Sequence, residues 1–206
     1  MSQPLVLFPT ANPERASSTA AAWIDQGYDC NFWTDGRFGR YPGYFAACNQ
    51  MISHWWDIGY DLFICGSDDI LPDPDQPAEE MVAKYRSRFP DHDGVMQPVG
   101  DSLPGTAEIC GSPWIGRRFI ENTYHNRGPY HPAYQAYFGD EELMCVAQQA
   151  DRLWMVLSAK QEHLHWLRPD IDKLPYQAAN ERFWDLDKAL FAQRKKEGFP
   201  GATDPG

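Results

Sequence analysis

Two adjacent carboxylates follow a short apolar run in residues 61–75, DLFICGSDDILPDPD. Asp68 and Asp69 repel each other, and a hard divalent cation relieves that repulsion. Mg²⁺ or Mn²⁺ held by one or two carboxylates usually completes its coordination with substrate phosphates. The alternative interpretation is a solvated turn leading into the next helix, and we assign Asp73 and Asp75 to that turn.

A second group of acids lies in residues 138–143, FGDEEL, where Asp140, Glu141 and Glu142 open a predicted helix. Acids in a first turn are explained by the helix dipole alone. The functional interpretation is a carboxylate at the mouth of a site, where it acts as a general base.

A pair of histidines, His163 and His165, lies in residues 158–169, SAKQEHLHWLRP, after a predicted strand. Imidazole nitrogen is a ligand that suits Mn²⁺ better than Mg²⁺. Because one residue separates them, the two rings point to opposite sides if the segment is extended. We therefore expect at most one of them to bind a metal ion, and the alternative is a pair without a ligand role.

Strands alternate with helices in the first hundred residues, which predicts an α/β fold with a mostly parallel sheet. Asn12 and Pro13 are typical of a helix start, and Gly27 of a helix end. Strands are expected at 4–11, 29–36, 61–66, 93–100 and 152–158, with another in 107–122. Helices are expected at 12–27, 44–56, 77–89, 140–150 and 175–198, followed by a frayed tail.

Sheets of this kind bind ligands beyond the carboxyl ends of their strands. Three polar groups fall at such ends: residues 10–12 after the first strand, Asp35 after the second, and residues 67–69 after the third. Their convergence at one edge is a stronger indication of a site than any one of them alone.

Composition limits the class of protein. The chain has 206 residues, enough for one domain, and a formal net charge of −11, which disfavours binding to duplex DNA. Its five cysteines are scattered without a CxxC pair, so neither a disulfide framework nor a zinc site is indicated. We see no membrane helix and no signal peptide, and expect a cytoplasmic protein.

Residues 4–168 contain five short motifs whose order resembles that of a compact GT-A-type glycosyltransferase, similar to the family 2 pattern. The pieces are LVLFPTANPE, the Asp-Gly of FWTDG, CGSDDILPDPD, FGDEEL and EHLH. CGSDDILPDPD resembles the DxD region with Ser67 in place of its first acid. FGDEEL resembles the motif of the catalytic base, with Gly139 in place of the expected Glu.

The resemblance implies a Rossmann-like GT-A fold and transfer of a sugar from a nucleotide-diphosphate sugar, with Mn²⁺ or Mg²⁺. It makes Asp69 the principal metal ligand, together with His163 or His165, and lets Asp68 contact ribose or metal. Asp140 takes the position of the catalytic base. The residues it assigns to the base and ribose of the donor are Thr10, Asn12, Arg15 and Asp35.

Two other functions remain open at this stage. A nucleotidyltransferase also combines an α/β sheet, a metal ion and a nucleotide, but residues 9–18, PTANPERASS, lack the expected glycines. A non-catalytic sugar- or nucleotide-binding module of the same fold is the other alternative. The acceptor is undetermined and is expected to be a glycan, a protein or a modified nucleobase. We expect a catalytic domain at 1–170 and a C-terminal helix and tail, 171–206, packed on it.

Overall fold

Strands and helices alternate over most of the first hundred residues, as the sequence predicts, except that strand Ile70–Pro72 directly follows strand Leu62–Cys65. The structure, a computed structural model, describes residues 3–100, 109–125, 128–168 and 171–202. Its strands are β1 (Leu5–Thr10), β2 (Asp29–Thr34), β3 (Leu62–Cys65), β4 (Ile70–Pro72), β5 (Val95–Val99), β6 (Trp114–Gly116) and β7 (Leu153–His163). Its α-helices are α1 (Pro13–Asp25), α2 (Tyr44–Trp55), α3 (Ala78–Arg88), α4 (Arg117–Glu121), α5 (Gly139–Gln149), α6 (Pro175–Asn180) and α7 (Trp184–Lys196). Short 3₁₀ turns are η1 (Asp35–Phe38), η2 (Trp56–Ile58) and η3 (Glu181–Phe183).

The strands form one 7-stranded sheet in the order β2-β1-β3-β6-β5-β7-β4. β1 pairs in parallel with β2 and β3, and β5 pairs in parallel with β7. β6 is antiparallel to both β3 and β5, and β4 is antiparallel to β7. Five strands therefore run in one direction, with β6 and β4 reversed, which confirms the predicted mostly parallel sheet.

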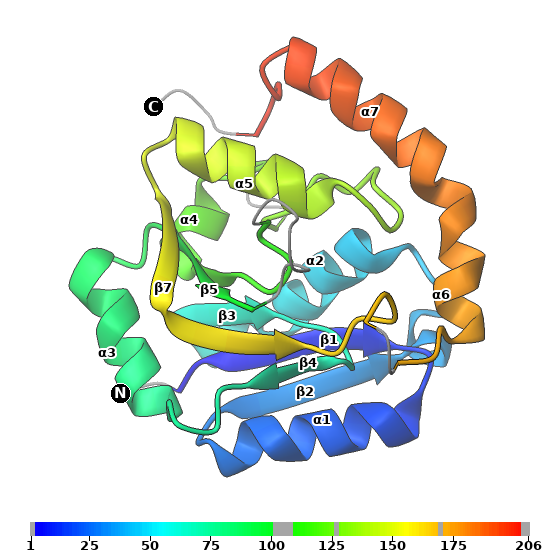
Figure 1. Cartoon of the computed structure of the whole chain (residues 1–206). Coiled ribbons are helices and arrows are strands. Elements are labelled where there is room, and N and C mark those ends of the chain that lie inside the picture. Colours follow the sequence, from blue (N-terminus) through cyan, green and yellow to red (C-terminus); the bar gives the residue numbers. More distant parts are fainter. Residues whose placement is uncertain (1–2, 101–108, 126–127, 169–170, 203–206) are drawn as a thin grey trace.

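Each face of the sheet is covered by helices, so the molecule has three layers (Figure 1). Side chains of β1 alternate between two separate cores: Val6 and Phe8 pack with α1 and α3, whereas Leu5 and Leu7 pack with α2 and α5. A strand covered on both faces reads as a continuous apolar run, and this is why residues 5–8 show no polar alternation.

Helix α1 begins and ends where the sequence predicts. The Asn12 side chain accepts a hydrogen bond from the backbone N–H of Arg15 at 3.1 Å, and Pro13 occupies the first helical position. Gly27 follows the helix with a φ of 88°, a left-handed conformation that glycine adopts without strain. This geometry places Thr10, at the end of β1, directly before the first turn of the helix.

Two strands in the middle of the chain differ from the prediction. Residues 70–72, for which no strand was expected, form strand β4, and β7 continues to His163 instead of ending at residue 158. The two differences have one cause, since Ile70 pairs with His163 and Pro72 with Gln161. Each segment is too short or too polar to be recognised as strand until its partner is known.

Two predictions for the C-terminus were also wrong. The expected single helix is interrupted by η3 between α6 and α7. The first half of the expected frayed tail, 199–206, is instead packed, with Phe199 and Ala202 each 3% exposed, and residues 203–206 lie outside the described part. The expected domain boundary after residue 170 falls beside residues 169–170, which lie outside the described part.

A buried ion pair fastens α7 to the core. The Arg194 guanidinium donates to both carboxylate oxygens of Glu142 on α5, at 2.8 Å from Nε and 2.8 Å from Nη2. Tyr134 donates to the same carboxylate at 2.7 Å, and Tyr124 also donates to it. Because Glu142 is 1% exposed, its charge depends on these donors for compensation.

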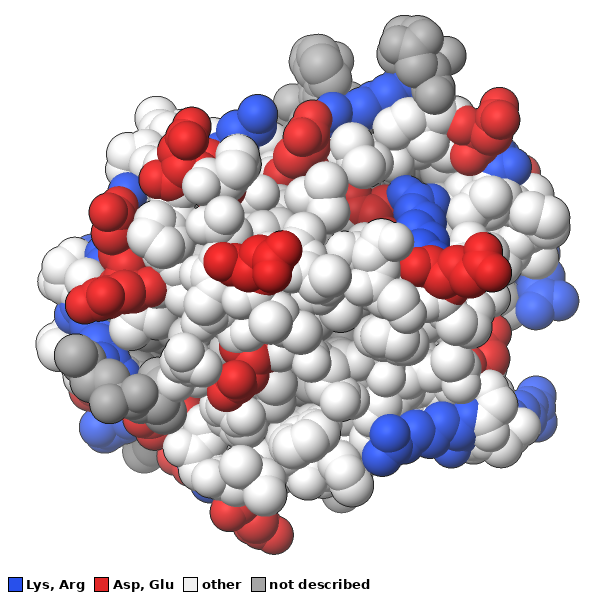
Figure 2. Space-filling view, turned by 90° about the horizontal axis from the view of Figure 1, so that it is seen from below, with Lys and Arg blue, Asp and Glu red and all other residues white. Residues whose placement is uncertain are grey.

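The charged side chains do not form a continuous basic surface on the face that Figure 2 shows, which is the face seen from below in Figure 1. Acidic side chains are scattered over it, and basic ones lie mainly toward its rim. This face therefore lacks the dense positive charge that non-specific duplex binding requires. Within the described residues, no helix is long and apolar enough to cross a membrane.

We predict that Arg194→Met lowers the free energy of unfolding by about 3 kcal/mol, because it leaves the buried Glu142 carboxylate without its cation. The exposed Lys196→Met, two residues further along the helix, is the matched control and should change stability by less than about 0.5 kcal/mol. Urea unfolding followed by circular dichroism measures both. Equal stability of the two variants would contradict the structural role given to the pair.

Candidate active site

Asp68 and Asp69 lie in the connection between β3 and β4 and are 5% and 4% exposed. Helix α1 holds the backbone of this connection. The Thr19 hydroxyl donates to the carbonyl of Asp68 at 2.7 Å, and the Trp23 indole donates to the carbonyl of Ile70 at 2.9 Å. The two carboxylates are therefore fixed, partly desolvated groups, and not the solvated turn that was the alternative interpretation.

The Asp68 carboxylate accepts two side-chain hydrogen bonds. Thr10 donates to it at 2.6 Å, and the Tyr176 hydroxyl of α6 lies 3.1 and 3.2 Å from its two oxygens. Burial, followed by the charge of Asp69, raises the pKa of Asp68 above its usual value, although the hydrogen bonds oppose this. The Thr10 hydroxyl is thus engaged in orienting Asp68.

The Asp69 carboxylate is surrounded by donors. His163 Nε2 lies 3.4 Å from it, Arg15 Nη2 lies 3.2 Å from it, and Ser67 and Gln177 also donate to it. Burial by itself raises the pKa of Asp69, but the hydrogen bond and charge of His163, with smaller contributions from Ser67 and Arg15, bring it below the usual value. Asp69 is therefore the more strongly ionised member of the pair.

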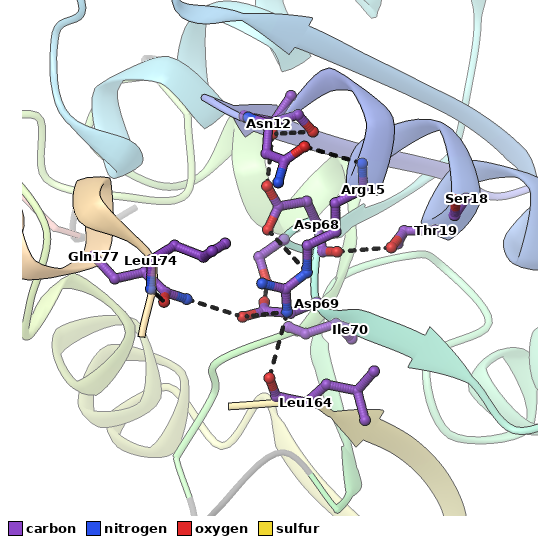
Figure 3. Close-up of polar contacts among 12 residues, drawn as sticks. Asn12, Arg15, Ser18, Thr19, Asp68, Asp69, Ile70, Leu164, Leu174 and Gln177 are labelled. Carbon is purple, nitrogen blue, oxygen red and sulfur yellow. Dashed lines mark hydrogen bonds and ion pairs between the residues drawn. The ribbon is translucent and has the colours of Figure 1, made fainter. Parts of the chain in front are cut away.

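Arg15 is the cation that faces both carboxylates (Figure 3), with Nε 3.9 Å from Asp68. Its Nη2 also donates to the carbonyl of Leu164 at 3.4 Å, which joins α1 to the segment after β7. Asn12 does not reach the carboxylates, because its side chain caps α1. The resemblance assigns Asn12 and Arg15 to the donor; in the structure Asn12 caps α1 and Arg15 faces the two carboxylates.

His163 and His165 lie on the same side of the chain, with ring centroids 5.0 Å apart at right angles. Opposite sides were expected only if the segment is extended, and that condition is not met, because the extended conformation ends at His163. The backbone N–H of Leu164 then donates to the carbonyl of Asp69 at 2.7 Å and turns the chain. The His163 imidazole is in contact with the Asp69 carboxylate.

A cavity of about 1050 Å³ connects these groups with Asp140. The residues predicted for the site that line it are Thr10, Asp35, Asp68, Asp69, Asp140, His163 and His165. Burial raises the pKa of Asp35, at the carboxyl end of β2. Asn12 and Arg15 are not among the lining residues that the structure describes. Carboxyl ends of β1, β2 and β3 thus meet at one cavity, as expected for this class of sheet.

Asp140 lies in the first turn of α5, and the packing around it explains why a glycine precedes it. A Cβ atom added to Gly139 would come within 2.7 Å of the Phe45 ring, so the Glu expected there does not fit. Glu142, two residues beyond Asp140, is turned into the core and paired with Arg194. The three acids of FGDEEL therefore separate, and Asp140 is the one that lines the cavity.

The loop before Asp140 is held by a buried carboxylate of α7. Asp187, which is 2% exposed, accepts hydrogen bonds from the backbone N–H groups of Gln135 at 3.1 Å, Ala136 at 2.9 Å and Tyr137 at 3.0 Å. Asp187 is thus a positioning residue for the loop that leads to Asp140.

Sequence reasoning missed the contribution of the C-terminal segment to the site. Tyr176 and Gln177 contact the two carboxylates from α6, and Trp184 lines the cavity. The start of α6 at Pro175 is visible in the sequence, but no local pattern reports a contact between residues 108 positions apart. Such a contact follows only from the three-dimensional fold.

The structure belongs to the GT-A class of Rossmann-like folds, as comparison with solved structures shows. The catalytic domain of Drosophila β1,4-galactosyltransferase 7, in complex with xylobiose, superposes with a TM-score of 0.52 at 15% identity, covering 88% of this chain and 80% of that one. A mutant of the same enzyme in complex with manganese, UDP-Gal and xylobiose gives 0.51 at 15% identity, with the same coverage.

Protein A197 from STIV is similar to the same degree, with a TM-score of 0.51 and 14% identity over 80% of this chain and 86% of that one. No protein-family model and no curated protein sequence matches the chain. At these identities the likeness establishes the fold, and the function has to be argued from the site itself.

We predict that Asp187→Asn lowers the free energy of unfolding by about 2 kcal/mol, because a neutral amide oxygen replaces a carboxylate that accepts several N–H groups. It should also accelerate hydrogen exchange at the amides of residues 135–137. Asp185→Asn, an exposed position on the same helix, is the control and should leave both unchanged. Unaltered exchange at 135–137 in Asp187→Asn would contradict the positioning role.

Proposed function

We propose that the chain is a metal-dependent glycosyltransferase that moves a sugar from a nucleotide-diphosphate sugar to an acceptor hydroxyl. The observation that carries the proposal is that one cavity of about 1050 Å³ joins buried carboxylates at the ends of parallel strands with a separate carboxylate, Asp140, at a helix start. This arrangement provides a place for a charged leaving group and, apart from it, a base. The GT-A fold supports the proposal, since its relatives in structure include a galactosyltransferase in complex with manganese and UDP-Gal.

The donor occupies the half of the cavity formed by the strand ends. Thr10, Asp35 and Asp68 line the cavity and would contact the ribose and base, while Arg15 faces the two carboxylates and Asn12 caps α1. Tyr41 also lines the cavity, and its ring offers a flat apolar surface to a ligand.

The residues present fit a divalent cation that is shared with the substrate. Asp69 Oδ1 and His163 Nε2 lie 3.4 Å apart, a carboxylate and an imidazole suited to Mn²⁺ or Mg²⁺. No three His, Cys, Asp or Glu side chains of the described ranges form a complete metal site. A partial set is what an ion bound through substrate phosphates requires. When bound, the ion would supply neutralisation of charge on the departing diphosphate.

Asp140 is the proposed catalytic base. In an inverting reaction it takes the proton from the acceptor hydroxyl while that oxygen attacks the anomeric carbon and the bond to the nucleoside diphosphate breaks. In a retaining reaction it orients the substrate instead. The rings of Tyr137 and Trp184, with centroids 5.0 Å apart, line the cavity beside it and offer apolar faces to a sugar. The acceptor itself belongs to the glycan, protein or modified-nucleobase classes.

A non-catalytic binding module of the same fold is the second candidate, favoured by Ser67 and Gly139, which stand where the resembled pattern has acids. Binding and turnover distinguish the two. The module binds a nucleotide without cleaving its sugar, whereas the enzyme does both. A nucleotidyltransferase would instead release diphosphate from a nucleoside triphosphate.

We predict that Mn²⁺ together with one of the nucleoside diphosphates raises the melting temperature, and that Asp69→Asn abolishes the shift. The substitution removes the proposed ligand while conserving size. Asp75→Asn, in the exposed turn beyond β4, is the control and should keep the wild-type response. A screen in which no nucleoside diphosphate stabilises the wild-type chain would refute the proposal.

We predict that His163→Gln weakens the metal-dependent binding of the nucleoside diphosphate at least about tenfold, and that His165→Gln changes it less than about threefold. The reason is that His163 contacts Asp69, whereas His165 contacts the His163 ring and Trp166. Titration of the diphosphate at saturating Mn²⁺ measures both affinities. A larger loss in His165→Gln would reverse the assignment.

We predict that Asp140→Asn retains nucleoside diphosphate binding and lowers the rate of sugar release from the nucleotide sugar by about 10²-fold or more if Asp140 is the base. Glu141→Gln is the matched control, because Glu141 is its neighbour on α5 and does not line the cavity. Hydrolysis of the nucleotide sugar identified by the thermal screen provides the assay. Equal rates in the two variants would remove Asp140 from the mechanism.

A further inference from the structure

A second, smaller cavity of about 560 Å³ adjoins the first and contains two arginines. Arg40 follows η1, and Arg182 lies in η3, so the two cations come from segments more than 140 positions apart. Tyr41, Asn180 and Arg182 line both cavities, which makes the two spaces continuous. The smaller one is therefore a side chamber of the proposed active site.

Neither guanidinium has a carboxylate partner among the described residues, although the chain carries 29 acids against 18 lysines and arginines. Glu181, the acid next to Arg182, is paired with Lys173 and does not neutralise it. The Arg182 guanidinium lies over the Phe183 ring at 4.6 Å, an arrangement that leaves the N–H groups at its edge able to donate. In an acidic protein, two such groups at one cavity are suited to a bound anion.

The position of the chamber assigns the anion to the acceptor and not to the donor. Its walls include Gly43 and Gln135, and Gln135 belongs to the loop that leads to Asp140. A Cβ atom added to Gly43 would lie 2.8 Å from the carbonyl oxygen of Gln135, so the two segments are in close contact. None of the strand-end residues Thr10, Asp68 and Asp69 lines this chamber.

We propose that the acceptor carries an oxyanion, either a phosphate monoester or a carboxylate, which binds between Arg40 and Arg182. Its reacting hydroxyl then extends into the larger cavity toward Asp140. Planar guanidinium groups donate two parallel hydrogen bonds to either oxyanion, whereas neutral hydroxyl groups gain no charge-assisted bond. This inference rests on the proposed glycosyl transfer and names the class of its acceptor.

Three related pyranoses test the proposal: glucose 6-phosphate, glucuronate and glucose. They differ only at the sixth carbon, which carries a phosphate ester, a carboxylate or a neutral hydroxyl group. Calorimetric titrations are made with Mn²⁺ and a saturating amount of the nucleoside diphosphate from the thermal screen, so that the donor half is filled. We expect one of the two anions to bind at least about tenfold more tightly than glucose. The anion that does so identifies the group as phosphate or carboxylate.

Arg40→Gln and Arg182→Gln should each weaken binding of the preferred anion, relative to glucose, at least about tenfold. Arg37→Gln is the matched control, since Arg37 lies three residues before Arg40, is exposed, and packs over the Trp33 ring at 4.0 Å outside the chamber. All three substitutions are at exposed positions, and an unchanged melting temperature verifies folding.

Two results would overturn the proposal: anions that bind no more tightly than glucose, or an equal loss of anion binding in Arg37→Gln. If the anion binds the free protein but is displaced by the nucleoside diphosphate, the arginines serve the donor and the acceptor assignment is wrong. Failure of the proposed function gives a different pattern, in which no nucleoside diphosphate binds at all. If anion binding still depended on Arg40 and Arg182, the two arginines would form an anion site that is not part of a glycosyltransferase. The assignment of the anion to an acceptor would then be wrong as well.

Discussion

The repulsion between two buried, adjacent carboxylates is the constraint on which the rest of the site depends. Asp68 and Asp69 are almost fully removed from water, and an uncompensated charge there would cost several kcal/mol. The compensation comes from four separate parts of the chain: the end of β1, the first turn of α1, the end of β7 and α6. The chain must therefore bring these elements together before the two acids are tolerated.

This compensation also shapes what the site can bind. Arg15 lies 3.2 Å from Asp69, so a metal ion arriving alone meets a guanidinium, and a diphosphate arriving alone meets two carboxylates. We propose that a divalent cation and a diphosphate bind together, with the cation against Asp69 and His163, because the cation offsets the carboxylates that would repel the phosphates. Charge balance thus favours binding of the ion and the diphosphate together over binding of either one alone. In a nucleotide sugar, the diphosphate would bind together with the ion in this way.

The sequence predicts those parts of the site that depend on local signals. The end of β1, the cap of α1 at Asn12 and the position of Asp68 and Asp69 after β3 follow from apolar runs and turn residues. β4 and the second half of β7 could not be predicted, because each is stabilised only by pairing with the other. The roles of Tyr176 and Asp187 depend on contacts over 108 and about 50 positions, for which a single sequence has no local signal.

The C-terminal segment connects the functions that the sequence treats separately. α6 places Tyr176 on Asp68 in the donor half, η3 places Arg182 in the side chamber, and α7 places Asp187 under the loop that leads to Asp140. One straight helix of this length would point along a single line and could not reach all three. The interruption at η3, together with the anchoring of α7 by Arg194, is therefore what allows one segment to serve both halves of the cavity. An element that looks in the sequence like a closing helix is, in the structure, the wall shared by the donor and acceptor sites that we propose.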